Sequence, residues 1–380
     1  MIDGIKTGCL PLDVEKLSGT LGVALNQKTA YCNRDGLIFG FSEMVDTDTG
    51  EVRYMCGLRG SVHKYANRGT HNADDFRMSD LYRVFIRLRD EYGIKPDCTR
   101  LYSIEFGVNL KLPYNPQRII RAARRYKASQ ITPMGDIGIE HKADAFRLKI
   151  YDKGKQCGLS DYNNTLRVEI KAERNYLKRC GVHVPMLGDL LNLDVWERFE
   201  NILLQAMGNI TFYEPAPLHG LTKKESDLIT LFSGDGWLKL DKYKCYRERK
   251  KFQTLSKRLN LGKMKADLKE LITKKCAQLR DVNVENRYRD GMFPMCKNGV
   301  QTKEAYKRQY GEDMKTATGT AFFQAAQKDE NRYRDGFKIK GVSVAKTQTE
   351  DVSLTNCSRG IMCAVKKYDT ITDETRINSS

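Results

Sequence analysis

A tyrosine at the end of an alternating stretch is the residue best placed to do chemistry. Residues 145–154 include an alternation of apolar and polar side chains in the order Phe146, Arg147, Leu148, Lys149, Ile150 and Tyr151. This period of two is typical of a half-buried strand, so we expect Tyr151 on the open face with the two cations. A phenol in cationic surroundings is suited to attack an anionic substrate such as a phosphate ester. The simpler alternative is a tyrosine that only ends a strand.

Two carboxylates occupy the middle of other predicted strands. Glu105 lies between apolar neighbours in residues 101–112, and Glu169 does so in residues 165–171. A carboxylate in a strand interior is costly unless it is ion-paired or binds a metal. The sequence leaves both alternatives open for each residue.

The whole chain is basic, with 65 Lys+Arg against 48 Asp+Glu and a net charge of +17 over 380 residues. Such an excess predicts a polyanionic partner, with nucleic acid ahead of a membrane surface. No apolar run approaches the ~20 residues of a membrane span, and the first ten residues resemble a strand rather than a signal peptide. The 11 cysteines contain no C-x-x-C pair, which favours reduced thiols in a cytosol over disulfides or a zinc knuckle.

The elements that would position these side chains are mainly strands. We expect an α+β fold, with a mainly antiparallel sheet and helices on one face. A polar loop at 67–76 precedes a helix that starts near Ser79 and ends before Gly93. The predicted strands are 1–10, 37–45, 51–56, 101–112, 135–141, 145–152 and 165–171.

Basic helices are predicted in two places. Residues 116–126 form a cationic helix in which Arg121, Arg124 and Arg125 offer phosphate contacts, unless they are only a solvated face. Further on, 243–259 and 263–279 are either a helix-turn-helix type DNA-binding module or helices packed on the sheet. We therefore expect a core at 1–215, a basic helical module at 216–280 and a poorly structured C-terminal extension at 281–380.

A family resemblance emerges from the order of short motifs. These are Met1-Ile-Asp3, Ile104-Glu105, Leu148-Lys-Ile-Tyr151, Leu166-Arg-Val-Glu-Ile-Lys171 and Tyr176-Leu-Lys. Together they resemble the gene II replication initiators of filamentous phages and their phage and plasmid relatives, over roughly residues 1–280. The triplet Tyr151-Asp152-Lys153 is also similar to the Tyr-Asp/Glu-Lys element of rolling-circle plasmid Rep initiators.

The resemblance implies a metal-dependent, site-specific DNA endonuclease and strand transferase. Tyr151 would nick one strand at a replication origin, form a 5′-phosphotyrosyl intermediate with a free 3′-OH, and later rejoin the strand. Arg147, Lys149 and Lys153 would steady phosphates. Implied partners are single- or double-stranded origin DNA and the replication machinery of a bacterial host, such as helicase and polymerase, in the cytoplasm and without a membrane.

The metal site implied by this resemblance departs from standard HUH nickases, because no His-hydrophobe-His triplet occurs and the core would be a degenerate Rep-like one. Glu105, His63, Asp152 and Glu169 are the predicted ligands for Mg²⁺ or Mn²⁺. His141 is the rival imidazole, and we prefer His63 because residues 61–65 alternate like a strand before a polar loop. The alternative function is a non-catalytic, sequence-specific DNA-binding replication or regulatory protein that acts through the basic helices.

Overall fold

The computed structural model describes residues 1–280, apart from 47–48, 128, 215–218 and 234, together with two short strands, β13 (Thr355–Asn356) and β14 (Met362–Cys363). The chain divides into a unit at 1–302 and a second unit at 303–380. In the second unit, β13 and β14 pair in antiparallel fashion. The remainder of the predicted extension lies outside the described residues.

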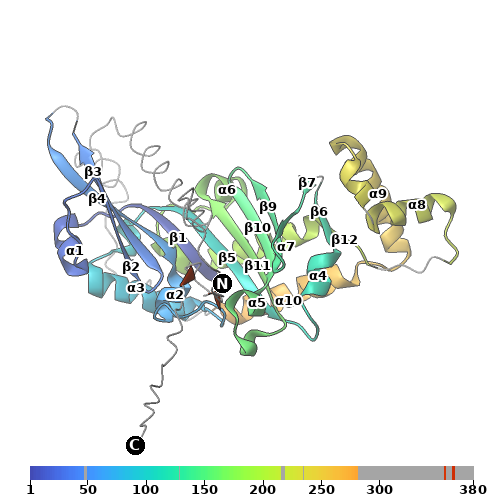
Figure 1. Cartoon of the computed structure of the whole chain (residues 1–380), viewed down its shortest axis with the longest axis horizontal. Helices are drawn as coiled ribbons and strands as arrows, with labels where there is room; N and C mark the ends of the chain where they lie inside the picture. Colours follow the sequence, from blue (N-terminus) through green and yellow to red (C-terminus); the bar gives the residue numbers. More distant parts are fainter. Residues whose placement is uncertain are drawn as a thin grey trace, which may run out of the picture. The chain divides into compact units, whose positions relative to one another are not determined.

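A nine-stranded sheet forms the centre of the first unit (Figure 1). Its order is β2-β3-β4-β1-β5-β11-β10-β9-β8, and every neighbouring pair is antiparallel. The strands are β1 (Ile2–Cys9), β2 (Thr29–Arg34), β3 (Leu37–Val45), β4 (Val52–Ser61), β5 (Leu101–Lys111), β8 (Thr132–Met134), β9 (Gly138–Ala143), β10 (Phe146–Asp152) and β11 (Thr165–Glu173). The predicted antiparallel α+β fold is confirmed.

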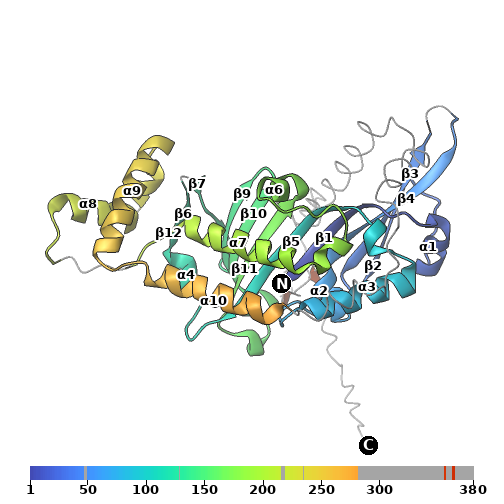
Figure 2. The same cartoon turned by 180° about the vertical axis from the view of Figure 1, so that it is seen from behind.

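Helices α3, α7 and α10 lie on one face of this sheet (Figure 2). The α-helices are α1 (Val14–Leu21), α2 (Val62–Ala66), α3 (Met78–Tyr92), α4 (Gln117–Ala122), α5 (Lys153–Cys157), α6 (Arg174–Arg179), α7 (Leu193–Asn209), α8 (Lys223–Ser233), α9 (Lys242–Arg258) and α10 (Lys263–Leu279). Short 3₁₀ helices are η1 (Pro96–Cys98), η2 (Ser160–Tyr162), η3 (Gly188–Leu191) and η4 (Asp235–Lys239). Phe106 of β5 stacks on Phe199 of α7 with ring centres 4.2 Å apart, so the apolar sides of the central strands face these helices.

Two predicted elements are wrong in type. The cationic helix expected at 116–126 ends at Ala122, and Ala123–Tyr126 is instead strand β6, which pairs with β12 (Ile210–Phe212) and β7 (Ser129–Gln130). Tertiary strand pairing here overrides the local helical pattern. His63 lies on α2 rather than on a strand, because the Ser61 side chain accepts a hydrogen bond from the Lys64 amide and caps a helix.

The basic helical segment has two separate environments. Leu268, Ile272 and Cys276 of α10 belong to the main core. A second core joins α8, η4 and α9 through Leu228, Ile229, Phe232, Trp237, Cys245, Phe252 and Leu255. Helix α10 therefore packs with the main core beside the sheet, whereas α8, η4 and α9 form a small helical module with a core of its own.

In the described part of the chain, no helix combines the length and apolar character needed to cross a membrane. Cysteines 9, 32, 56, 157, 180, 245 and 276 form no disulfide.

Candidate functional site

Tyr151 lies on the polar face of the sheet, opposite the face that packs on the helices. In the register, Tyr151 pairs with Arg167 and Gly138, and Lys149 pairs with Glu169. The predicted face is therefore correct, but the expected exposure is not, since only 4% of Tyr151 is accessible. Part of the reason is local: a Cβ on Gly138 would lie 2.4 Å from the Tyr151 Cβ, so the tyrosine occupies the space that this glycine leaves free.

Glu169 is the centre of a buried charged cluster. Its Oε2 accepts a hydrogen bond from the Tyr151 hydroxyl at 3.1 Å, and its Oε1 accepts one from Lys149 Nζ at 2.8 Å. Arg167 Nε also approaches Oε2, at 3.4 Å. Burial raises the pKa of Glu169, but the charges of Lys149 and Arg167 outweigh it and lower that pKa to about 2. Glu169 is thus a carboxylate that orients the phenol.

The Tyr151 phenol is neutral in this arrangement. Burial and the negative charge of Glu169 raise its pKa well above the ordinary value, although Arg167 acts in the opposite direction. Ionisation of the hydroxyl therefore needs an additional positive charge, or a base that takes the proton as the oxygen attacks.

Arg167 connects the cluster to the other side of β5. Its Nη1 donates to Asn109 Oδ1 at 3.2 Å and its Nη2 to Asp3 Oδ2 at 3.3 Å. Arg167 and Asp3 were not among the site residues predicted from the sequence. A signal for Arg167 was present, because it alternates with Glu169 along the same strand and so shares its face.

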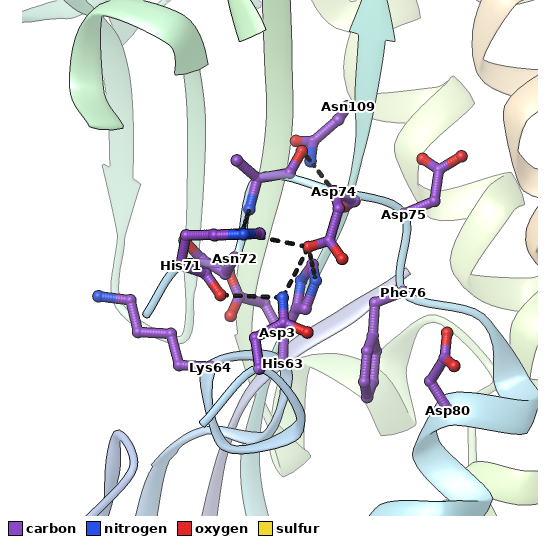
Figure 3. A network of polar contacts seen from close by, with 12 residues as sticks. Asp3, His63, Lys64, His71, Asn72, Asp74, Asp75, Phe76, Asp80 and Asn109 are labelled. Atoms are coloured by element: carbon purple, nitrogen blue, oxygen red, sulfur yellow. Dashed lines mark hydrogen bonds and ion pairs between the residues drawn. The ribbon is translucent and has the colours of Figure 1, made fainter. Parts of the chain in front are cut away.

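The polar loop at 67–76 crosses the sheet beside Tyr151. Asn72 Nδ2 donates to Asp3 Oδ2 at 2.7 Å, and Lys153 Nζ donates to Asn72 Oδ1 at 2.8 Å. Asp3 is on β1, and Lys153 directly follows β10. Because β5 and β11 lie between these two strands, the hydrogen bonds of Asn72 reach across two intervening strands. Asn109 Nδ2 also donates to the Ala73 carbonyl, at 2.8 Å (Figure 3).

His63 and Asp74 form a second polar group at this loop (Figure 3). Asp74 Oδ1 lies 2.7 Å from His63 Nε2, accepts from Asn67 Nδ2 at 2.8 Å, and is 3.4 Å from His71 Nδ1. Burial lowers the pKa of His63, although its hydrogen bond to Asp74 opposes this. Asp74 was not among the predicted site residues.

The four predicted metal ligands have separate partners. Glu105 pairs with Lys171 Nζ at 3.0 Å, and the Asp152 side chain accepts from the Lys155 amide at 3.0 Å, which caps α5. His63 pairs with Asp74, and Glu169 with Lys149. Among the residues that the structure describes, no group of three or more His, Cys, Asp or Glu could hold a metal ion. These side chains do not fit a metal in this arrangement, and the dependence on Mg²⁺ or Mn²⁺ stays a prediction.

Of the predicted phosphate-binding cations near the tyrosine, Lys153 is the most deeply buried. It is 1% exposed, and its Nζ is 5.9 Å from the centre of the Tyr151 ring. Burial and the charge of Arg167 lower its pKa to about 8. Lys149 is ion-paired with Glu169, and Arg147 Nε is 3.9 Å from Glu140 Oε2.

The three arginines of the helix predicted at 116–126 differ in their surroundings. Arg121 is exposed, and Arg124 lies over the Tyr213 ring, 5.6 Å from its centre. Arg125 is 2% exposed and donates to the Trp237 carbonyl at 2.7 Å and to Cys245 Sγ at 3.1 Å. The predicted phosphate contact at Arg125 is therefore replaced by a structural one, which attaches the small helical module to β6.

The sequence matches no protein-family model and no curated protein. A structure search finds the rolling-circle replication initiator protein from Geobacillus stearothermophilus, at 12% identity and a TM-score of 0.31. The match covers 61% of this chain and 96% of that chain. A TM-score this low establishes no common fold.

Proposed function

We propose that this protein nicks one DNA strand and rejoins it, as a rolling-circle replication initiator, with Tyr151 as the nucleophile. The observation that supports the proposal is the Tyr151 hydroxyl, held 3.1 Å from a buried carboxylate and surrounded by Lys149, Lys153 and Arg167. A tyrosine that only filled space would not need this number of desolvated charges around its oxygen.

The proposed reaction exchanges one phosphodiester for another. The Tyr151 oxygen gives its proton to water and attacks phosphorus. The bond from phosphorus to the 3′ oxygen breaks, and that oxygen takes a proton from water as the 3′-OH, so no net proton is gained or lost. The new 5′-phosphotyrosyl ester keeps the bond energy, so attack by a 3′-OH in the reverse direction rejoins the strand. Arg167 and Lys153 offset charge on the phosphoryl oxygens, and Glu169 orients the phenol.

Access to the hydroxyl requires a rearrangement. Tyr151 is almost fully buried, and the loop at 67–76 is tied across the neighbouring strands by Asn72. A DNA phosphate is an alternative acceptor for Lys153, so we propose that substrate binding replaces the hydrogen bond from Lys153 to Asn72.

Mg²⁺ or Mn²⁺ as cofactor, action at a replication origin, and cooperation with host helicase and polymerase are further parts of this proposal. Chelation with EDTA before the nicking assay tests the metal. A metal-dependent adduct supports that part, and an adduct of undiminished yield contradicts it.

The alternative function is non-catalytic DNA binding for replication or regulation. The observation that favours this alternative is that Tyr151 is buried and has a raised pKa, as expected of a tyrosine with a purely structural role.

Adduct formation separates the two functions. Wild-type protein is incubated with supercoiled plasmid or labelled single-stranded oligonucleotides that carry a candidate origin, with Mg²⁺ or Mn²⁺, and covalent protein–DNA product is measured on denaturing gels. Tyr151→Phe removes only the attacking oxygen, so we expect no detectable adduct and DNA affinity within about twofold of wild type, a factor worth less than 1 kcal/mol.

Tyr162→Phe is the matched control, because Tyr162 is a nearby tyrosine that packs against His71 at 5.8 Å rather than against Glu169. It should form adduct normally. A normal yield from Tyr151→Phe would assign the nucleophile elsewhere, and wild-type protein that binds every origin tested without forming adduct would favour the alternative.

A further inference from the structure

Helix α9 exposes two large aromatic side chains outside the candidate site. Tyr243 is 76% exposed and Tyr246 is 49% exposed. They are three residues apart, so they lie on the same side of the helix. Lys250 Nζ is 4.8 Å from the centre of the Tyr246 ring and extends this side by one turn.

The same helix carries a dense positive charge. Its 17 residues contain eight cations, Lys242, Lys244, Arg247, Arg249, Lys250, Lys251, Lys257 and Arg258, against the single carboxylate Glu248. Some are neutralised, since Lys251 pairs with Glu248 at 2.8 Å and Arg258 with Glu225 at 2.7 Å. Within the described part of the chain, Lys242, Lys250 and Lys257 have no ion-pair partner.

The apolar side of α9 is already occupied. Phe252 stacks on Phe232 of α8 with ring centres 4.0 Å apart, and Cys245 and Leu255 belong to the same small core. The opposite side, which we call the outward face of α9, consists of Tyr243, Tyr246, Arg247, Lys250 and Lys257. No apolar stripe remains for insertion into a lipid surface, so the outward face suits a polyanion in water rather than a membrane.

We propose that the outward face of α9 docks on duplex DNA. This would be a second contact, separate from the group around Tyr151 and Glu169, which we call the nicking centre. The inference rests on the proposed function to the extent that both sites would act on the same DNA. A helix of 17 residues is about 25 Å long, and its convex surface can enter a major groove about 12 Å wide. Proteins that bind single strands instead combine a concave groove with stacking platforms.

The module of α8, η4 and α9 is attached to the unit that carries Tyr151, so DNA bound by α9 would be held close to the nicking centre. Arg125 of β6 donates to Trp237 in η4 and to Cys245 in α9, so the module is fixed to the unit that carries Tyr151. Duplex held by α9 would raise the local concentration of the flanking strand at the nicking centre.

The test compares duplex and single-stranded binding by the full-length protein. Fluorescence anisotropy with a 30-base-pair duplex and with one of its strands is measured for wild type and for the variant Tyr243→Ala/Tyr246→Ala/Arg247→Ala/Lys250→Ala. We expect the duplex affinity of the variant to fall at least tenfold below wild type. The slope of its affinity against salt concentration should decrease by the equivalent of about two phosphate contacts. Its single-strand affinity should stay within about threefold of wild type. Lys16→Ala/Arg83→Ala removes two exposed cations elsewhere and is the control for the two charges lost on α9.

Unchanged duplex affinity in the quadruple variant, or an equal loss in the control, would overturn the proposal. So would anionic lipid vesicles that bind wild type but not the variant while duplex binding stays intact. The nicking proposal and the docking proposal can fail independently. If wild type forms no adduct but the quadruple variant loses duplex binding, nicking is contradicted and duplex docking by α9 is supported. Thermal unfolding of each variant confirms that these surface changes leave the fold intact.

Discussion

At Glu169, three donors converge on one buried carboxylate, and this arrangement determines how the site responds to substitution and pH. Lys149, Arg167 and the Tyr151 hydroxyl are all polar groups with little access to water. Each would be costly to bury alone, so the cluster is stable only when its charges balance.

Glu169→Gln should lower the free energy of unfolding by about 3–5 kcal/mol at pH 7, because it removes the ion-pair partner of Lys149 and leaves the buried Arg167 with Asp3 alone as its counter-charge. The folded pKa of about 2 lies below the ordinary 4.5, so the carboxylate stabilises the fold above pH 4.5 and loses this contribution as the pH falls from 4.5 to 2. Urea unfolding of wild type and variant at several pH values measures the difference, which should shrink in that window.

Glu105→Gln is the matched control, since Glu105 and its ion-pair partner Lys171 are both partly exposed. Its cost should stay below about 1 kcal/mol. A difference between wild type and Glu169→Gln that is constant from pH 7 to pH 2 would contradict the assigned role of the Glu169 charge.

At the scale of elements, one polar side chain at the loop 67–76 and another at the helical module connect distant segments. Asn72 joins the loop to β1 and to Lys153, and Arg125 joins β6 to η4 and α9. Both connections link segments far apart in the sequence.

Asn72→Ala should cost about 1–3 kcal/mol, because it leaves Asp3 and Lys153 each short of a buried hydrogen-bond partner. We also expect faster amide hydrogen exchange in residues 67–76, measured by mass spectrometry. Thr70→Ala is the control, since the Thr70 hydroxyl donates within the loop, to the Asn67 carbonyl. Equal exchange rates in Asn72→Ala and wild type would show that the loop is held by other contacts.

Arg125→Met keeps much of the side-chain volume but removes the two donors to the helical module. We expect a loss of about 1–3 kcal/mol, concentrated in α8 and α9, because the Trp237 carbonyl loses its buried partner. Hydrogen exchange resolved by segment measures this. Arg121→Met, at an exposed position on α4, should leave exchange in α9 unchanged. An equal increase in both variants would argue against Arg125 as the attachment.

At the scale of the whole molecule, the net charge of +17 predicts that the proposed DNA binding depends strongly on salt. If six or more phosphates are contacted, affinity for non-specific duplex should fall on the order of 10³-fold between 50 and 200 mM salt. Titration of binding against salt concentration measures the slope. A slope near zero would contradict phosphate contact as the main source of affinity.

The sequence alone determined the strands of the large sheet other than β2 and β8, the face of Tyr151 and the positions of Glu105 and Glu169. It could do so because side chains alternate with a period of two along a strand whatever its neighbours are. It also placed the helix at α3 and its end at Gly93, which adopts a left-handed conformation.

Only the tertiary structure decided what surrounds those side chains. The burial of Tyr151, the crossing of Asn72 over two strands, the conversion of 123–126 to a strand and the internal role of Arg125 all depend on segments distant in the chain. Local periodicity carries no information about which distant segment will pair with or cover a residue. For that reason the polar face could be predicted, and its closure around the tyrosine could not.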